Sequence, residues 1–252
     1  MIQTAFPRTR LFTTRPLAPR SRIALDKSRT HYLRTVLRLG IGERIRLFNG
    51  VDGEWIASID ELSKNDAILR VTNRTRAQRP EPDIWLAFAA LKKTPMDFVA
   101  EKATELGASV LQPFMAERSN VARVNGGRLA ATARDAAQQC ERLSVPEVRD
   151  CLDFETVLAD WPGNRRLFAM DETGGGAPFV ALLHKAGRRE KHAILVGPEG
   201  GFTEAERARL DARPHVARAT LGGRVLRAET ACLTALALWQ NILGDGATPP
   251  GA

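Results

Sequence analysis

A chain of 252 residues, 44% hydrophobic and 26% charged, can bury a substantial core and is typical of a soluble globular protein of one or two domains. No apolar run approaches the ~18 residues that a membrane span requires, and no short apolar core follows a basic start, which disfavours a membrane protein and a secreted one. Three cysteines without CxxC spacing and four scattered histidines indicate free thiols in a reducing cytoplasm and no metal site.

The positive charge is concentrated in the first third of the chain. Up to Arg79 there are 16 Lys and Arg against 7 Asp and Glu, whereas the remainder carries a net charge of −1. This asymmetry predicts a module that binds a polyanion, joined to a nearly neutral one. The alternative is a protein with arginine on every solvated face.

The first third has the pattern of a small β-barrel with one helix. Asp26 can cap a helix with His31, Tyr32, Leu33, Val36 and Leu37 on one side. Gly and Asn turn signals separate the later strand-like runs. The expected strands lie at 8–14, 22–25, 44–49, 55–59 and 67–71.

A proline- and arginine-rich linker at 74–82 leads to alternating strands and helices, the pattern of a parallel α/β domain. The last helix is apolar on most sides, so it needs cover on more than one face. Strands are expected at 84–90 and 110–115 and from 194 and 216. Helices are expected over 128–143 and 229–243 and from 94 and 203. Weaker elements are expected at 154–159, at 167–170 as a strand and at 179–185 as a helix.

Two glycine loops follow predicted strands near the carboxyl end of the chain. The first, Gly197–Gly201, precedes Thr203 and Glu206, which have the spacing of a capping box. The second contains Gly222 and leads into the last helix. Loops of this kind leave backbone N–H groups bare for a ligand, although each could also be a tight turn.

These segments carry a resemblance to a known family. Leu195-Val-Gly-Pro-Glu-Gly-Gly-Phe-Thr-Glu-Ala-Glu206 and Leu221-Gly-Gly-Arg-Val-Leu-Arg-Ala-Glu-Thr-Ala231 resemble the two signature blocks of the RsmE family, the ribosomal RNA small subunit methyltransferases E of the SPOUT class. The resemblance implies a PUA-like RNA-binding β-barrel at 1–75 and a SPOUT methyltransferase domain at 76–244. That second domain would be an α/β parallel sheet with a C-terminal trefoil knot. Residues 245–252 are expected to form a disordered tail.

The resemblance also implies a cofactor, S-adenosylmethionine, and two partners, the 16S rRNA of the small ribosomal subunit and a second copy of the chain in a homodimer. Arg227 and Glu199 are the expected catalytic residues. The expected cofactor-binding residues are Met170, Leu195, Gly197, Pro198, Glu199, Gly200, Gly201, Leu221, Gly222, Leu226, Glu229, Thr230 and Ala231. The expected RNA-binding residues are Arg8, Arg10, Arg22, Arg34, Arg38, Lys92, Lys93, Arg118, Gln139 and Arg142. Packing is an equal alternative for Gln139 and Arg142, which would share a helix face.

The implied reaction is methylation of uridine N3 at position 1498 of the rRNA. Because N3–H is a weak acid, the nitrogen becomes nucleophilic once its proton leaves; Glu199, or a water it holds, could accept that proton and Arg227 could stabilise the anion. Asp171 and Glu172 follow a strand, where acids often bind a ribose or amino group. The glycines at 174–176 lack the GKS sequel of a P-loop. Two alternatives stay open: a SPOUT enzyme that acts on another base or on a ribose 2′-OH, and a non-catalytic RNA-binding factor.

Overall fold

The computed structural model of the chain describes residues 6–247, which form two compact units. The first unit comprises the chain up to Pro80 together with Ala137–Ser144, and the second comprises Glu81–Ala136 and the chain from Val145 onward. The sequence placed a single boundary after residue 75. Nothing in its composition indicated that a short segment from the middle of the chain belongs to the first unit.

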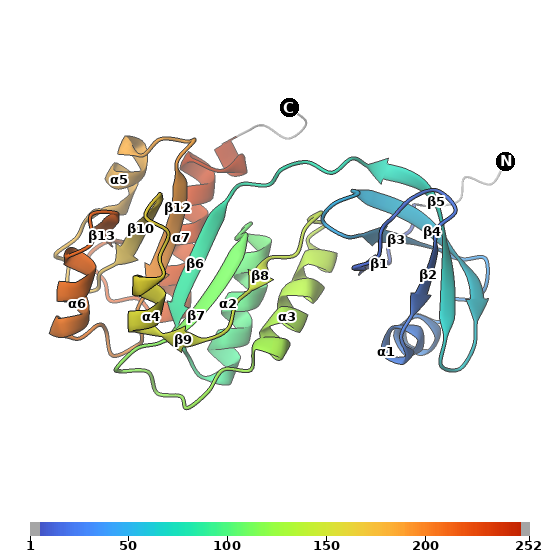
Figure 1. Cartoon of the computed structure of the whole chain (residues 1–252), viewed down its shortest axis with the longest axis horizontal. Coiled ribbons are helices and arrows are strands. Elements are labelled where there is room, and N and C mark those ends of the chain that lie inside the picture. The colour runs from blue at the N-terminus through green and yellow to red at the C-terminus, as the bar shows by residue number, and fades with distance from the viewer. Residues whose placement is uncertain (1–5, 248–252) are drawn as a thin grey trace. The chain divides into compact units, whose positions relative to one another are not determined.

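The first unit is built on a five-stranded sheet of order β1-β3-β4-β5-β2 (Figure 1). Only the β1–β3 pair is parallel. Alternate residues of the long strands enter one core, as Trp55, Ala57 and Ile59 do, and the strand expected at 55–59 is confirmed. The strands are β1 (Arg10–Phe12), β2 (Arg22–Leu25), β3 (Arg44–Phe48), β4 (Glu54–Leu62) and β5 (Ala67–Arg76).

The helix of this unit starts as the sequence predicts. The Asp26 side chain accepts a hydrogen bond from the backbone N–H of Arg29 at 2.9 Å and caps α1 (Lys27–His31). The chain then widens into a π-helical turn, η1 (Tyr32–Val36), which rotates the side chains that follow. Leu33 is fully buried, but His31, Tyr32 and Val36 are exposed, so the prediction that they share one buried face was wrong for these three residues.

A buried ionic cluster lies at the start of the first unit. Glu54 has no exposed surface; the Arg10 guanidinium donates to it at 2.6 Å, and Arg46 approaches within 3.6 Å. Arg10 also lies over the Phe48 ring at 3.7 Å. Burial lowers the pKa of Arg10, and the hydrogen bond to Glu54 offsets part of that effect. The expectation that Arg10 binds RNA was therefore wrong, because its side chain is buried and contacts Glu54 and Phe48 inside the first unit.

Arg10 also determines where helix α3 (Gly126–Gln139) ends. Its guanidinium donates to the carbonyl oxygen of Ala137 at 2.7 Å and to that of Arg142, both within the first unit. Glu141 has a φ of +64° and turns the chain away. The helix thus ends four residues before the predicted Leu143. The expectation that Gln139 and Arg142 share a helix face was wrong, because Arg142 follows the helix.

The second unit is a parallel α/β sheet of order β11-β13-β10-β12-β6-β7-β8, with β9 also paired to β7. Every pair of strands in it is parallel, as the alternation of strands and helices predicts. The strands are β6 (Ile84–Ala89), β7 (Val110–Met115), β8 (Glu147–Val148), β9 (Leu152–Asp153), β10 (Arg165–Met170), β11 (Ala177–Pro178), β12 (Lys191–Val196) and β13 (Val216–Thr220).

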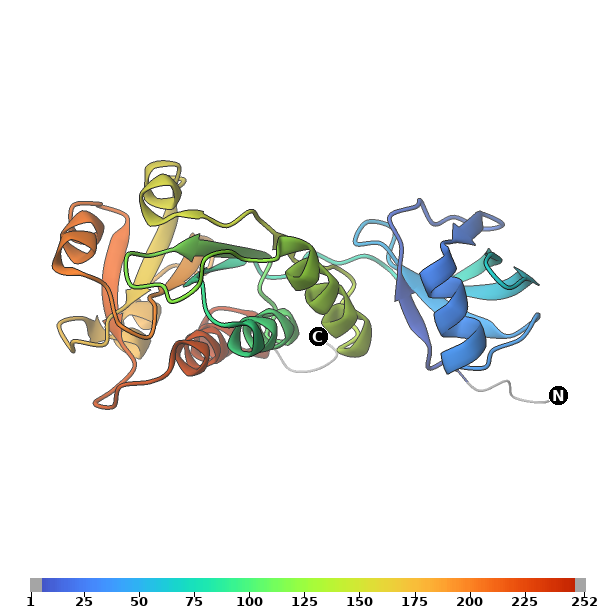
Figure 2. The ribbon, with the colours of Figure 1, turned by 90° about the horizontal axis from the view of Figure 1, so that it is seen from below.

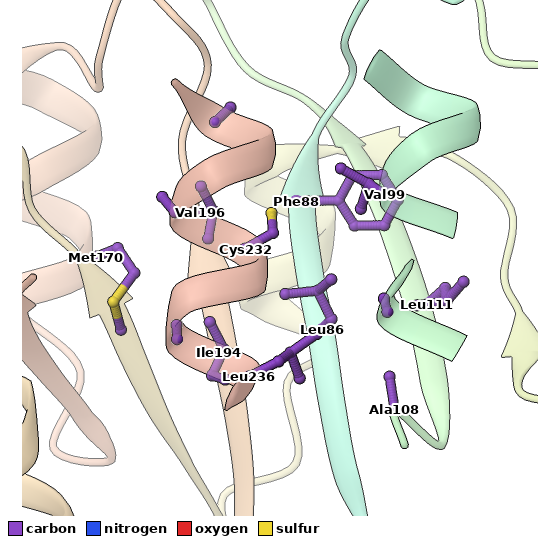
Figure 3. Close-up of a cluster of buried hydrophobic side chains, with 14 of the residues drawn as sticks. Leu86, Phe88, Val99, Ala108, Leu111, Met170, Ile194, Val196, Cys232 and Leu236 are labelled. Atoms are coloured by element: carbon purple, nitrogen blue, oxygen red, sulfur yellow. The ribbon is translucent and has the colours of Figure 1, made fainter. Parts of the chain in front are cut away.

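Helices cover both faces of this sheet (Figure 2). One face packs against α2 (Lys93–Glu105), α5 (Phe179–Lys185) and α7 (Ala228–Ile242), and the other against α4 (Phe154–Ala159) and α6 (Glu204–Asp211). Strand residues alternate between the two faces, so Ile194 and Val196 join Cys232 and Leu236 of α7 in the core that Figure 3 shows.

The apolar last helix has cover on several sides within the same chain. Helix α7 packs against strands β12 and β6 and against helices α2 and α5. Leu233 and Leu238 stay half-buried. After α7, Asp245–Ala247 form a short 3-10 helix, which is the start of the segment expected to be disordered; residues 248–252 lie outside the described residues.

His192 gives the second unit a pH dependence that can be measured. The side chain has no exposed surface, and neither ring nitrogen has a hydrogen-bond partner within residues 6–247; Glu190 Oε2 lies 3.6 Å from Nε2. Burial lowers the pKa of His192, and Glu190 offsets this only in part. The unfolded chain therefore binds more protons below the ordinary histidine pKa near 6.5. We expect the free energy of unfolding to fall below that pH by up to about 1.4 kcal/mol per pH unit.

Thermal unfolding at about pH 7 and pH 5 tests this expectation. His192→Phe should show a smaller loss of stability on acidification than the wild type, because phenylalanine has no proton to bind. His184→Phe is the control, since His184 is exposed on α5. Equal acid sensitivity of wild type and His192→Phe would contradict the assignment.

Candidate functional site

A pocket of about 570 Å³, including space open to solvent, lies where three neighbouring parallel strands end. Strands β13, β10 and β12 are adjacent, and the loops after their carboxyl ends, 171–176, 197–203 and 221–227, surround the pocket together with the first turn of α7. The carboxyl edge is where parallel α/β sheets bind ligands. The lining consists of Met170, Asp171, Glu172, Val196, Gly197, Pro198, Glu199, Thr220, Leu221, Gly222, Arg224, Val225, Leu226, Ala228 and Ala231.

The loop after β12 requires glycine at two positions. A Cβ on Gly197 would lie 2.8 Å from the Phe202 ring, which is itself fixed between Phe114 and Phe154. Gly201 has a φ of +68°, and its N–H donates to the Pro198 carbonyl at 2.9 Å. The tight turn therefore places Gly197, Pro198 and Glu199 in the lining of the pocket and Gly201 behind it.

The predicted capping box is confirmed at the start of α6. The Thr203 hydroxyl accepts from the N–H of Glu206 at 3.2 Å, and the Glu206 carboxylate accepts from the N–H of Thr203 at 2.8 Å. Glu206 also accepts from the N–H of Glu117, which ties the loop after β7 to this helix. The loop after β12 is thus held rigidly at its end.

The loop after β10 is held by Asp171. Its carboxylate accepts hydrogen bonds from Arg218 Nε at 3.0 Å and from the N–H of Thr173 at 2.9 Å. Burial raises the pKa of Asp171, but the hydrogen bonds from Arg218 and Thr173 outweigh burial and lower it below its ordinary value. Asp171 therefore stays ionised at the base of the pocket. Gly176 in the same loop packs so closely on β13 that a Cβ would lie 2.7 Å from the Ala219 nitrogen.

The loop after β13 is the most exposed wall. Gly222 has a φ of +116° and open space around it, and Val225 is 79% exposed. Arg224 lines the pocket, whereas Arg227 is the N-cap residue of α7 and is exposed outside the lining. The two arginines thus occupy different places around one site.

Eight of the expected cofactor-binding residues meet in this pocket: Met170, Gly197, Pro198, Glu199, Leu221, Gly222, Leu226 and Ala231. Leu195 does not, because strand alternation places it in the core against α4 and α6 while Val196 faces the pocket. Gly200 and Gly201 form the turn behind the lining. Glu229 and Thr230 lie in the first turn of α7 outside the lining, and Glu229 Oε2 is buried without a hydrogen-bond partner among the described residues.

Seven lining residues were absent from the expected set: Asp171, Glu172, Val196, Thr220, Arg224, Val225 and Ala228. The position of Asp171 and Glu172 directly after a strand was a usable signal for them. Arg224 had a weaker signal, as a charged residue next to two glycines.

Cationic residues continue along the same edge of the sheet. Lys92 and Lys93 follow β6, and Arg118 follows β7, the next strands beyond β12. All three are exposed, and Arg118 Nη1 donates to the Gly200 carbonyl at 2.8 Å. In the first unit Arg8, Arg22, Arg34 and Arg38 are exposed, although Arg22 forms an ion pair with Glu61. Arg142 is half-buried and Gln139 exposed.

Within residues 6–247 no helix is long and apolar enough to cross a membrane. Within the same residues no three His, Cys, Asp or Glu side chains gather as they would around a metal ion.

Comparison with known proteins assigns the class. Residues 78–240 match the family described as RNA methyltransferase domain, and residues 25–72 match the RNA methyltransferase PUA domain. The fold and its pocket at the carboxyl edge thus belong to an RNA methyltransferase with an attached PUA domain.

The relatives identify the family more narrowly. Ribosomal RNA small subunit methyltransferase E of Rickettsia conorii is 31% identical over 229 residues, which cover 90% of this chain and 93% of the relative; that of Bacillus subtilis is 31% identical over 217 residues, covering 82% and 84%. The crystal structure of ribosomal RNA small subunit methyltransferase E from Neisseria gonorrhoeae bound to S-adenosyl methionine matches with a TM-score of 0.85 at 28% identity, covering 94% of this chain and 98% of that one. The chain belongs to the ribosomal RNA small subunit methyltransferase E family, which confirms the resemblance of its two glycine blocks.

Proposed function

We propose that this chain transfers a methyl group from S-adenosylmethionine to N3 of a uridine, position 1498, in the 16S rRNA of the small ribosomal subunit. The observation that carries the proposal is the pocket formed by the loops after β10, β12 and β13 in a chain of this family. The gonococcal relative, which covers nearly the same length, is bound to S-adenosyl methionine.

The residues of the pocket suit that cofactor. Met170, Leu221 and Leu226 offer apolar surface to an adenine ring, and the backbone of Gly222 can approach a ligand closely because it carries no Cβ. The carboxylates of Glu172 and Glu199 favour a ligand that carries positive charge on its sulfonium and amino groups. When bound, the cofactor supplies an electrophilic methyl group.

Glu199 and Arg227 are the proposed catalytic residues. Glu199 is exposed in the pocket lining, where it or a water that it holds can accept the N3 proton. Arg227 lies outside the lining, on the same loop as Leu221 and Leu226, where a guanidinium can stabilise the negative charge that spreads onto O2 and O4 of the uracil.

RNA would be held by the exposed cations of both units. Lys92, Lys93 and Arg118 lie along the edge next to the pocket, and Arg8, Arg22, Arg34 and Arg38 are the candidates in the first unit. Gln139 and Arg142 stay weaker candidates, because the helix face that would unite them does not form. Arg10 is withdrawn from the set.

Two structural proposals accompany the function. The half-buried Leu233 and Leu238 of α7 support a homodimer, which light scattering of the purified protein would detect. The strand order β13-β10-β12, with α7 returning from β13 to pack on β12 and β6, supports a C-terminal trefoil knot of the SPOUT type. The free cysteines among the described residues fit a reducing cytoplasm.

Isothermal titration with S-adenosylmethionine tests the proposal. We expect saturable binding that S-adenosylhomocysteine competes away. The rival, a non-catalytic RNA-binding factor, predicts no heat and no competition.

A matched pair of glycine substitutions tests the position of the cofactor. Gly197→Ala should weaken S-adenosylmethionine binding, because its Cβ would lie 2.8 Å from the Phe202 ring and the loop after β12, which lines the pocket, must shift to relieve that contact. Gly223→Ala is the control, since nothing lies within 4 Å of its Cβ and Gly223 is outside the lining. Equal affinities of the two variants would place the cofactor elsewhere.

A further inference from the structure

A second hollow, of about 1100 Å³ with its solvent-open space, lies at the carboxyl ends of β6 and β7. Leu91, Met96 and Leu129 form its buried floor. Val121 and Val124, from the long loop between β7 and α3, are partly buried against the same core and form one wall. The floor and this wall are apolar, although the hollow opens onto a charged rim.

The rim carries two positively charged side chains that form no ion pair within residues 6–247. Lys93 and Arg123 are exposed, line the hollow and have no carboxylate partner within residues 6–247. Arg128, in contrast, donates from Nε to both oxygens of Asp97, at 2.8 and 3.0 Å, so these two lining charges neutralise each other. The hollow therefore has a net positive charge from two side chains that are available to an anion.

The loop that forms one wall of this hollow also contacts the loop that lines the cofactor pocket. The loop that contributes Val121 and Arg123 begins with Arg118, which donates to the Gly200 carbonyl at 2.8 Å. A Cβ on Gly200 would lie 3.3 Å from the Arg118 Cβ, so the two loops touch. Gly200 in turn follows Pro198 and Glu199 of the pocket lining. The loop that lines the second hollow thus contacts the loop that lines the cofactor pocket.

We propose that this hollow binds the RNA nucleotide next to the target uridine, with the apolar floor against its base or ribose and with Lys93 and Arg123 on the flanking phosphates. An apolar surface rimmed by unpaired cations matches the chemistry of a nucleotide, and phosphate contacts of this kind fix the register of RNA on a protein. The inference rests on the proposed function, because it assigns part of the substrate to a site beside the cofactor pocket.

Kinetics of Arg123→Ala and Lys93→Ala test the assignment. Each variant should raise KM for the RNA by about tenfold and reduce the slope of log affinity against log salt by about one, because one phosphate contact is lost. Neither should change the dissociation constant of S-adenosylmethionine, which also shows that the variant is folded. Arg123→Lys should recover part of the RNA affinity, since it keeps the charge.

Lys185→Ala is the control, because it removes an equal charge from the exposed end of α5. An unchanged KM in both Arg123→Ala and Lys93→Ala, or an equal rise in Lys185→Ala, would overturn the inference while leaving the methyltransferase proposal intact. Absence of S-adenosylmethionine binding and of methylation by the wild type would overturn the proposed function instead.

Discussion

Replacement of Arg227 by alanine is expected to lower kcat for RNA methylation by about 10²–10³-fold, the usual effect of removing one group that stabilises an anion in a transition state. The dissociation constant of S-adenosylmethionine should stay unchanged, because Arg227 is the N-cap of α7 and does not line the pocket. Single-turnover rates and isothermal titration of the same preparation give the two quantities separately.

Arg224 provides the matched comparison on the same loop. Arg224 lines the cofactor pocket, so Arg224→Ala should change the affinity for S-adenosylmethionine more than it changes the rate at saturating cofactor. A normal rate in Arg227→Ala with normal cofactor affinity would refute the role assigned to Arg227. If Arg224→Ala lost the methylation rate and Arg227→Ala kept it, Arg224 would be the residue that stabilises the anion.

The second large effect concerns stability of the first unit. Glu54→Gln should lower its free energy of unfolding by about 3–5 kcal/mol, because it removes the buried carboxylate beside Arg10 and leaves that buried charge with neutral carbonyl acceptors alone. Arg10 and Arg46 are 5% and 6% exposed, so neither guanidinium can turn to water. Urea unfolding measures the loss, with hydrogen exchange of the β3–β5 amides assigning the transition to this unit.

Glu61→Gln is the control for Glu54→Gln. Glu61 pairs with Arg22 on an exposed part of the same unit, where ion pairs contribute little. We expect its unfolding transition to coincide with that of the wild type. A Glu54→Gln protein as stable as the wild type would show that the buried cluster can rearrange around a neutral side chain.

The sequence predicts well those features that are encoded locally. The strand-like run at 55–59 between two turn signals gave a strand, and Thr203 with Glu206 gave the capping box that begins α6. The two glycine loops were sufficient for the family, and eight of the fifteen residues that line the pocket were predicted from the sequence. The capping box joins residues that are only three apart in the chain.

The features that the sequence missed depend on distant contacts. Arg10 appeared to be one more surface arginine, but its partners are Glu54 and the carbonyls of Ala137 and Arg142. The same contacts fix the end of α3, which helix propensity alone extended to Leu143. Val196 lines the pocket and Leu195 does not, because the two residues lie on opposite faces of the sheet, which different helices cover. No pattern within the strand distinguishes the two faces.

We propose that the three glycine-containing loops hold a methyl donor beside one uridine of small-subunit rRNA. The most direct test incubates the protein with 30S subunits or free 16S rRNA and isotopically labelled S-adenosylmethionine, followed by mass spectrometry of the nucleosides. We predict label in 3-methyluridine at a single position, and its loss in Gly197→Ala at limiting cofactor. Label in a 2′-O-methylated nucleoside or in another base, or no label from a protein that binds the cofactor, would contradict the account.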